Sequence, residues 1–402
     1  MEKTVHITSE RLQDRQRVIA QGALTNSKHP DSYIKGVYPT HLVSGRGAHV
    51  KDNKGKEYID FISGLGTNLL GYGHKVITKS IFNNYCNGIN LSLPTNIEVE
   101  AAEQILTILP QYHQVKFLKS GTDACNAAVR IARSHTGRKK ILTSGYHGWG
   151  DTFISTLPVS FGAHDINSEM LINLDQIDET VAGVIVEPVI LDFDVRDHLI
   201  KLQDKCNSVG ALLIFDEIIT AMRVPDLTIT KHYNLEPDLV LMGKALAGGL
   251  PLSCVVGKKE IMDDRRYFVS GTFYGEMLSL AVCRDIIFAL KTKRPNIDDL
   301  WVFGEHFKEI FNKNLNGIVQ LEGFNTRFSL KGEPKLKALF MQEAAKAGML
   351  FGASPFISFA HIELSVQIEQ YLKNVANKIN TGMAKLEGEL PSSPFANKQR
   401  NI

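Results

Sequence analysis

The sequence lacks the features that mark several large classes of protein. Its 402 residues include only five cysteines, which are scattered and form no CxxC pair: Cys86, Cys125, Cys206, Cys254 and Cys283. Such a set argues against a disulfide framework or a cysteine zinc site and is typical of reduced thiols. The sequence also has no apolar run long enough to span a bilayer, and its N-terminal residues lack the apolar core of a signal peptide. We therefore expect a cytoplasmic protein.

A charge excess and internal repeats are missing as well. The 45 basic and 43 acidic side chains nearly cancel, for a formal net charge of +2. A balanced surface produces no long-range basic field, so neither nucleic acid nor a membrane is an expected partner. The length allows a full α/β core together with a second domain.

Apolar patterning predicts how that length is organised. The stretch "GAHVKDNKGKEYIDFISG", residues 47–64, predicts a β-hairpin around a turn at 52–55, after a helical and then looped segment at 1–30. From residue 71, buried apolar strands such as "AGVIVEPVI", "ALLIFDEII", "DLVLMGK" and "LSCVVG" alternate with amphipathic helices, which predicts a mostly parallel sheet.

This pattern ends near residue 295 and predicts three chain regions. Residues 1–70 and 296–402 would form a smaller α+β domain from both chain ends, and residues 71–295 a large domain. A helix around Leu364–Ile379 is predicted near the C-terminus, followed by a loose, proline-broken tail from Gly388.

Polar side chains follow four of the predicted strands at the point where each strand ends. They are Tyr146–His147, Glu187, Asp216–Glu217 and Lys244. The carboxyl ends of parallel strands meet at one edge of a sheet, where ligands bind. We therefore expect these side chains to lie along a single rim.

The stretch "LKSGTDACNAAVRIARS" predicts an anion site at a helix N-terminus. Ser120, Gly121 and Thr122 precede the helix and would leave backbone N–H groups open to a phosphate. The alternative is an ordinary helix cap by Thr122 or Asp123.

Asp216 and Lys244 each allow two interpretations. A carboxylate at the end of an apolar strand needs a partner, which is either a nearby arginine such as Arg223 or a protonated ring nitrogen of a cofactor. Lys244 is either a solvated loop lysine or a nucleophile that forms a Schiff base. The nucleophile is favoured by four small residues that clear space around the amine: Ala245, Ala247, Gly248 and Gly249.

Tyr146 and His147 complete the set. Tyr146 either stacks on a planar ring or packs at the strand end. His147 has no second metal ligand at a suitable spacing, so we expect no metal. Together, a phosphate cradle, a stacking aromatic, a carboxylate and a lysine match the needs of pyridoxal phosphate, which acts as an electron sink at the substrate carbon.

With these motifs the sequence resembles the class III aminotransferases of fold type I, and most of all their glutamate-1-semialdehyde 2,1-aminomutase branch. The matching segments span about residues 10–380: "KDNKGKEYIDF", "SGTDA", "YHG", "VEP", "LLIFDEIITAMRV", "PDLVLMGKALAGGLP" and "SGT" at 270–272. The resemblance implies an α/β transferase fold, pyridoxal phosphate as cofactor, small-molecule amino donors and carbonyl acceptors, and a homodimer with shared active sites.

The resemblance also implies roles for individual residues. Lys244 would carry the cofactor as an internal aldimine, and Asp216 would pair with its pyridine nitrogen. The two ring faces would contact Ile218 and Tyr146. Gly121 and Thr122, next to Ser120, would bind the phosphate, and Thr272 would reach the phosphate in the neighbouring subunit. Glu187 and His147 match positions close to the cofactor.

Departures from the family pattern concern the substrate side. Glu276 and Met277 replace the usual Asn-Pro, and the N-terminal stretch "NSKHPDSYIKG" lacks the arginine that holds the substrate carboxylate in aminomutases, with Lys28 or Lys35 as possible substitutes. Asp192 and Asp194 after "VEP" would suit a hydroxylated or amino substrate at the mouth, or would be solvated loop residues.

We therefore expect an aminotransferase that acts on an aldehyde or ketone. The first alternative is an aminomutase that shifts an amino group within one substrate. More remote alternatives are a protein that binds the cofactor without catalysis and a nicotinamide-dependent dehydrogenase, for which the glycine-rich stretch 64–73 is the only hint.

Overall fold

The computed structural model describes residues 18–157 and 162–391, so a predicted helix in the first 17 residues lies outside the described residues. Its strands are β1 (Leu42–Arg46), β2 (His49–Asp52), β3 (Glu57–Asp60), β4 (Gln114–Leu118), β5 (Lys140–Ser144), β6 (Ser168–Met170), β7 (Val181–Val186), β8 (Leu212–Asp216), β9 (Leu239–Met242), β10 (Ser253–Gly257), β11 (Gln320–Phe324), β12 (Arg327–Lys331) and β13 (Met349–Leu350).

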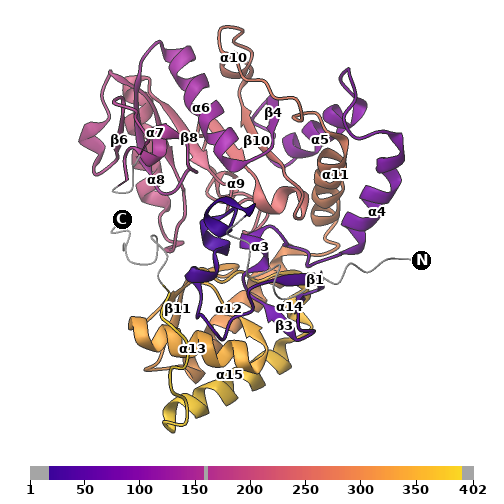
Figure 1. The fold of residues 1–402 in the computed structure, drawn as a ribbon. Coiled ribbons are helices and arrows are strands. Elements are labelled where there is room, and N and C mark those ends of the chain that lie inside the picture. Colours follow the sequence, from indigo (N-terminus) through magenta and orange to yellow (C-terminus); the bar gives the residue numbers. More distant parts are fainter. Residues whose placement is uncertain (1–17, 158–161, 392–402) are drawn as a thin grey trace.

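Helices connect and cover these strands (Figure 1). They are α3 (Ser63–Gly66), α4 (Lys75–Asn84), α5 (Asn96–Leu106), α6 (Gly121–Thr136), α7 (Asp151–Ile154), α8 (Arg196–Val209), α9 (Ile229–His232), α10 (Lys259–Met262), α11 (Met277–Lys291), α12 (Ile297–Asn314), α13 (Pro334–Ala347), α14 (Phe359–Ile362) and α15 (Ser365–Asn380).

A seven-stranded sheet forms the centre of the upper part of the molecule in Figure 1. Its order is β4-β10-β9-β8-β7-β5-β6, and the strands from β6 to β9 are parallel. This confirms the predicted mostly parallel sheet. The apolar pattern predicts that "LSCVVG" is one of the parallel strands, but this prediction is wrong: the segment is β10, which is antiparallel to both β9 and β4. A short connection at 243–252 joins β9 to β10, and it has no room for the crossover that a parallel pair needs.

Helices on both faces bury the sheet, as its apolar strands predict. Ile214 of β8 packs in the cluster that includes α6, whereas its neighbours Leu213 and Phe215 pack in the cluster that includes α8. Successive side chains of a strand point to opposite faces of the sheet, so only a strand that is apolar throughout can pack into the apolar clusters on both faces. Helix α8 connects β7 to β8 and ends at Gly210, its left-handed C-cap.

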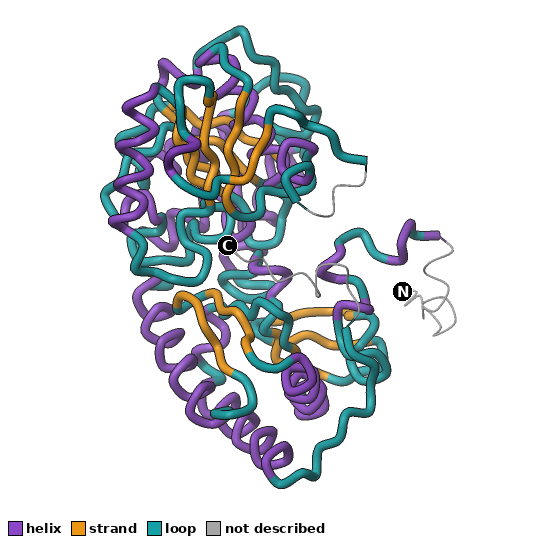
Figure 2. Tube along the Cα trace, turned by 90° about the vertical axis from the view of Figure 1, so that its left-hand side faces the viewer, coloured by secondary structure: helices purple, strands orange, loops and turns teal. Residues whose placement is uncertain are grey.

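The lower part in Figures 1 and 2 contains both ends of the described chain. Strands β2 and β3 form the predicted hairpin, and β3 pairs in parallel with β13, from near the other end of the chain. Helix α13 packs against β13, helix α15 packs against α12 and α13, and β11 and β12 form a separate ribbon that contacts α12. This pairing supports the proposed small domain from both chain ends.

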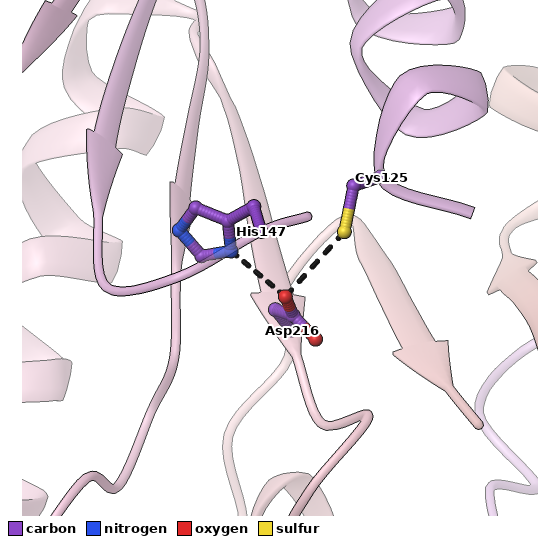
Figure 3. A group of neighbouring side chains, drawn as sticks. All are labelled: Cys125, His147 and Asp216. Carbon is purple, nitrogen blue, oxygen red and sulfur yellow. Dashed lines mark hydrogen bonds and ion pairs between the residues drawn. The ribbon is translucent and has the colours of Figure 1, made fainter. Parts of the chain in front are cut away.

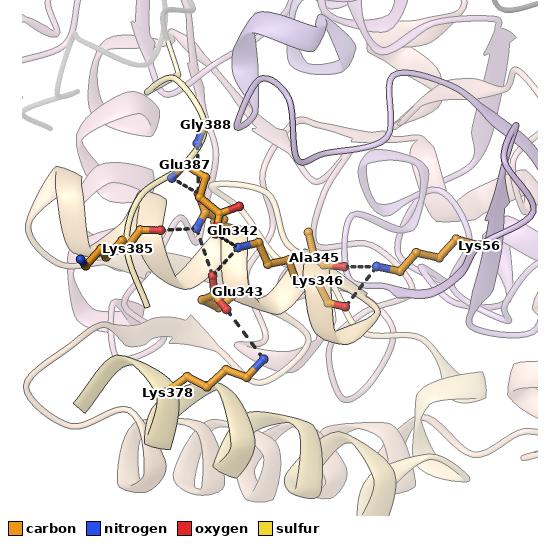
Figure 4. A network of polar contacts seen from close by, with 9 residues as sticks. All are labelled: Lys56, Gln342, Glu343, Ala345, Lys346, Lys378, Lys385, Glu387 and Gly388. Carbon is orange, nitrogen blue, oxygen red and sulfur yellow. Dashed lines mark hydrogen bonds and ion pairs between the residues drawn. The ribbon is translucent and has the colours of Figure 1, made fainter. Parts of the chain in front are cut away.

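The chain after α15 is held against α13 by a polar network (Figure 4). The buried Gln342 amide donates to the Lys385 carbonyl at 2.8 Å, and its oxygen accepts from Glu387 N at 2.8 Å and Gly388 N at 3.2 Å. The prediction of a loose tail from Gly388 is therefore wrong for Gly388 itself, and residues 392–402 lie outside the described residues. A polarity pattern could not reveal this attachment, because the partner amide lies on a distant helix.

The glycine-rich stretch 64–73 does not follow a strand of the large sheet. It runs through α3 and the loop after it, next to β3 of the four-stranded sheet. A dinucleotide fingerprint requires a turn between a parallel strand and its helix, so the dehydrogenase alternative loses its only support. Among the helices within 18–157 and 162–391, none combines the length and apolar character needed to cross a bilayer.

Gly304 provides a stability test of the packing of α12. A Cβ at this position would lie 1.6 Å from the Asn325 carbonyl oxygen, in the turn between β11 and β12. Replacing glycine by alanine within a helix stabilises the helix by about 1 kcal/mol. Overpacking a buried site, however, lowers the stability of the protein by about 1–3 kcal/mol or more. We expect Gly304→Ala to lower the free energy of unfolding in urea by about 2 kcal/mol. Gly352→Ala is the control, because its nearest contact would be an ordinary 3.6 Å to Ile62. Equal stability of the two variants would contradict the packing.

Candidate active site

The carboxyl ends of β5, β7, β8 and β9 surround a cavity of about 350 Å³. The predicted site residues that line it are Gly121, Thr122, Tyr146, His147, Glu187, Asp216, Ile218 and Lys244. Residues up to 123 positions apart in the sequence thus meet in one place, because each follows a strand or begins a helix at the same edge of the sheet.

Lys244 enters the cavity in an unusual backbone conformation. It opens a 3₁₀ turn, Lys244–Ala247, with a φ of 42°, in the left-handed region that lysine rarely adopts. Burial lowers the pKa of the Lys244 amine, and the positive charge of Arg327 lowers it further, while the carboxylates of Asp216 and Glu187 oppose both effects. The amine therefore becomes a neutral nucleophile more readily than a solvated lysine does.

Three hydrogen bonds hold Asp216 at the end of β8, and Figure 3 shows the two that involve His147 and Cys125. Its Oδ2 contacts His147 Nδ1 at 2.8 Å and accepts from the Cys125 thiol at 3.4 Å, and its Oδ1 accepts from Ile218 N at 3.1 Å. The side chain is 4% exposed. Arg223, the protein partner considered for this carboxylate, instead donates to the carbonyls of Gly66 and Ile357.

His147 connects Asp216 to the preceding strand. Its Nε2 lies 3.0 Å from the Ser144 carbonyl oxygen, which can only accept, so Nε2 carries a hydrogen. The contact between Nδ1 and Asp216 Oδ2, at 2.8 Å, joins the carboxylate to the same ring. This arrangement orients the carboxylate and leaves acceptor capacity on Asp216 for a donor in the cavity.

Cys125, His147 and Asp216 also place three metal-ligand atoms within 4.8 Å of one another. The sequence did not reveal this group, because Cys125 lies on α6, away from the other two. Burial and the charge of Asp216 raise the pKa of the Cys125 thiol well above its usual range, so the thiol keeps its proton. A thiol that donates to Asp216 is a poor metal ligand, since metals bind the thiolate. Hydrogen bonding accounts for the group.

The N-terminus of α6 forms an open anion cradle. Ser120 is its N-cap: the Ser120 hydroxyl accepts from Asp123 N at 3.1 Å, and Asp123 Oδ2 accepts from Ser120 N at 2.9 Å. The cap is thus Ser120 and not Thr122 or Asp123, the alternatives considered from the sequence. Because its hydroxyl is engaged, exposed Ser120 lies outside the cavity lining, and Gly121 and Thr122 face it.

Close approaches around this cradle require glycine at two positions. A Cβ on Gly121 would lie 2.9 Å from the Ile218 side chain, and a Cβ on Gly148 would lie 2.2 Å from Thr122 Oγ1. Gly148 also has a φ of 92°. The loop after β5 therefore packs directly on the first turn of α6, which closes one side of the cavity.

Glu187 and Glu217 have different roles although each follows a buried strand. Glu187 lines the cavity, and its Oε1 accepts from Tyr146 N at 2.7 Å, which fixes the loop that carries the half-exposed tyrosine. Glu217 points away from the cavity and accepts from Ile229 N at 2.6 Å and Thr230 N at 2.8 Å. It anchors the start of α9.

The remaining candidates lie outside the cavity. Thr272 is exposed in a turn, as are Asp192 and Asp194 in their loop, where Asp194 N donates to Asp192 Oδ1 at 2.9 Å. Lys28 is exposed, and Lys35 pairs with Asp31 at 3.2 Å and with Glu389.

Three residues near the site were missed by sequence reasoning. Cys125 contacts Asp216, Lys119 lines the cavity, and Arg327 acts on Lys244 through its charge. A signal existed for Lys119, which directly precedes the "SGT" motif at the end of a predicted strand. None existed for Arg327, because it comes from β12 in the other part of the molecule.

A family model for class-III aminotransferases matches residues 34–160 and 157–354. The chain belongs to the class-III aminotransferase family. It is 30% identical over 340 residues to "Glutamate-1-semialdehyde 2,1-aminomutase 2" of Lachnoclostridium phytofermentans, with 77% of this chain and 78% of the relative covered. It is 32% identical over 291 residues to the glutamate-1-semialdehyde 2,1-aminomutase of Aquifex aeolicus, with 65% and 69% covered.

Solved structures agree on the fold of this class-III enzyme. The internal aldimine form of the Sphingopyxis sp. MTA144 FumI protein, which contains pyridoxal phosphate, superposes with a TM-score of 0.84 at 21% identity. The alignment covers 95% of this chain and 98% of that chain. With its membership of the class-III family, the chain is a fold type I enzyme that depends on pyridoxal phosphate.

The residues of the cavity fit this cofactor. The cradle at Gly121 and Thr122 offers N–H donors to a phosphate, Asp216 keeps acceptor capacity for a protonated ring nitrogen, and Lys244 presents an amine with a lowered pKa. Ile218 and Tyr146 line the same cavity as apolar and aromatic walls.

The lowered pKa of Lys244 predicts how the amine reacts in the protein freed of cofactor. A group with a lowered pKa loses its proton at a lower pH. As the pH is raised, acylation of Lys244 by acetic anhydride should therefore reach its midpoint at a lower pH than acylation of solvated lysines does. Peptide mass spectrometry over a pH series measures this midpoint. We expect Arg327→Met to move the midpoint upward, because the variant removes a positive charge that lowers the pKa.

Arg138→Met is the matched control for this measurement. Arg138 also donates to backbone carbonyls, but at the opposite end of β7, next to Val181. It should leave the midpoint unchanged. A Lys244 midpoint equal to that of exposed lysines would contradict the electrostatics of the site.

Proposed function

We propose that this enzyme transfers an amino group from a donor amine to an aldehyde or ketone. The observation that carries the proposal is the convergence of Lys244, with its lowered pKa, and the hydrogen-bonded Asp216 on one cavity beside an anion cradle. Membership of the class-III family supports the same reaction.

Each residue has a task in this proposal. When bound, pyridoxal phosphate supplies an electron sink for the carbanion at the substrate carbon. Asp216, oriented by His147, accepts a hydrogen bond from the ring nitrogen and keeps it protonated. Gly121 and Thr122 bind the phosphate through the start of α6. Lys244 Nζ removes the proton at the substrate carbon and later returns it, which its lowered pKa favours.

The N-terminal segment supports an acceptor without the carboxylate that aminomutases hold there. Neither lysine considered as a substitute for the missing arginine lines the cavity, and Lys35 is paired with Asp31 and Glu389. An ammonium that is already paired on the surface is poorly placed to select a substrate.

One observation favours an aminomutase as the second candidate function. Arg327 is close enough for its charge to act on Lys244, and its guanidinium donates to the Ile190 carbonyl in the loop after Glu187. An arginine suits a substrate carboxylate, because it can donate two parallel hydrogen bonds. The curated relatives named as aminomutases support this candidate.

We expect purified enzyme to be yellow and to convert carbonyl acceptors only when an amino donor is added. Each turnover should release one oxo product from the donor, because the amino group passes between two substrates. A panel of donors and acceptors, followed by cofactor absorbance and chromatography, measures this. Lys244→Ala should lower kcat by at least about a thousandfold through loss of the proton-transfer group, whereas Lys259→Ala on the exposed side of α10 should not.

The two candidate functions separate in this experiment. Isomerisation of a single substrate without any added donor and without a released oxo product would replace the aminotransferase by the aminomutase. Full turnover by Lys244→Ala would contradict both.

We further propose a homodimer in the cytosol, in which Thr272 reaches the phosphate bound by the neighbouring subunit. Exposed apolar side chains surround its turn, including Phe268 at 76% and Phe273 at 61% exposed. A cavity of about 660 Å³ lies between this turn, α5 and β4. Such a patch is typical of a protein interface. The cysteines of the described residues are unpaired thiols, which supports a reducing compartment.

The dimer can be tested at its apolar surface. Phe273→Glu places a charge in the proposed interface, so we expect monomers in sedimentation velocity and faster loss of cofactor on dialysis. Phe288→Glu is the control, because Phe288 is similarly exposed, at 60%, but lies on α11 outside that cavity. A dimer that persists in Phe273→Glu would contradict this surface.

A further inference from the structure

Lys119 places a buried ammonium group next to the anion cradle. It lies between the end of β4 and the N-cap of α6, and its side chain lines the same cavity as Gly121 and Thr122. Its Nζ has no exposed surface and no hydrogen-bond partner among the described residues. A buried ammonium without acceptors is costly, so this position calls for a ligand that accepts hydrogen bonds.

Glu276 holds Lys119 in place but does not satisfy it. Glu276 Oε1 lies 3.4 Å from Lys119 Nζ, an ion pair between side chains that are 13% and 17% exposed, respectively. The same carboxylate is the N-cap of α11, where it accepts from Leu278 N at 2.8 Å and Ser279 N at 3.0 Å. Its position is therefore set by α11, and the lysine N–H groups remain available to the cavity.

The unusual residues at positions 119 and 276 thus form one structural unit. Glu276 stands where the family pattern has asparagine, and the structure shows that it pairs with a lysine that lines the same cavity as Gly121 and Thr122. Burial lowers the pKa of Lys119, and the charge of Glu276 opposes this shift, which helps the ammonium to stay charged.

We propose that Lys119 binds the phosphate of the cofactor, with Glu276 as its positioning residue. A phosphate at the N-terminus of α6 would offer acceptor oxygens to the N–H groups of Lys119 that make no hydrogen bond within the described chain, and would add negative charge to that of Glu276. Lys119 then supplements the N–H groups of Gly121 and Thr122 with a full positive charge. This inference rests on the cofactor of the family and not on the proposed amino transfer.

The test compares binding of pyridoxal phosphate and of pyridoxal, which lacks the phosphate, to the protein freed of cofactor. Absorbance titration gives both dissociation constants. We expect Lys119→Met to weaken binding of pyridoxal phosphate by about tenfold or more, as for the loss of a charged hydrogen bond, and to leave binding of pyridoxal unchanged. Lys119→Arg should restore part of the loss, because it keeps the charge. Circular dichroism establishes that each variant is folded, and Lys119→Gln replaces the methionine variant if that one fails to fold.

Lys116→Met is the matched control. Lys116 lies on β4, the strand that ends directly before Lys119, but it lines the cavity of about 660 Å³ at the proposed dimer surface. It should leave both dissociation constants unchanged.

Two outcomes would overturn the proposal. Equal weakening of both ligands by Lys119→Met would show a structural role only. Unchanged affinity for pyridoxal phosphate with a raised KM for one substrate would show that the lysine holds a substrate anion instead. Because the titration needs no turnover, a failure of the amino-transfer proposal would leave this result intact.

Discussion

The site depends on keeping charged groups out of water at the edge of an apolar sheet. Asp216 ends a strand whose other side chains are all apolar. Its carboxylate is stable there only because His147, Cys125 and a backbone N–H contact it. Lys244, at the end of the adjacent strand, responds to the same burial with a lowered pKa. The electrostatics that suit the cofactor follow from where these two strands end.

Backbone geometry lets these groups approach one another. Gly121 and Gly148 make room where a Cβ would collide with Ile218 or Thr122, and Lys244 adopts a positive φ to turn into the cavity. Such strain persists only where surrounding packing imposes it. Here the fully buried strands β8 and β9 and the first turn of α6 provide that packing.

The two parts of the molecule contribute to the site together. Buried Arg223, just after β8, donates to the carbonyls of Gly66 and Ile357, and Thr326 Oγ1 donates to the Arg223 carbonyl at 2.6 Å. These contacts tie the segment that carries Asp216 to α3 and to the ribbon of β11 and β12. Through the same ribbon Arg327 acts on Lys244. Changes in the C-terminal part can therefore alter the reactivity of a lysine on the large sheet.

Much of the fold and of the site was predictable from the sequence because local patterns encode it. Apolar runs predicted the parallel strands, and the polar residues at their ends predicted a shared rim at Glu187, Asp216 and Lys244. The exception among the strands was β10, whose direction depends on the length of a connection and on its neighbours, and not on its own residues.

Only the tertiary structure decided which groups that are distant in the sequence contact one another. The sequence by itself determined the family, the cofactor and the residues that face the cavity, since these follow from motifs and from strand ends. Which partner each side chain takes depended on the folded chain: Cys125 rather than Arg223 for Asp216, Glu276 for Lys119, and Gln342 for the backbone at Gly388. The physical reason is that a buried polar group must be satisfied by whatever packs against it, and no local pattern records that neighbour.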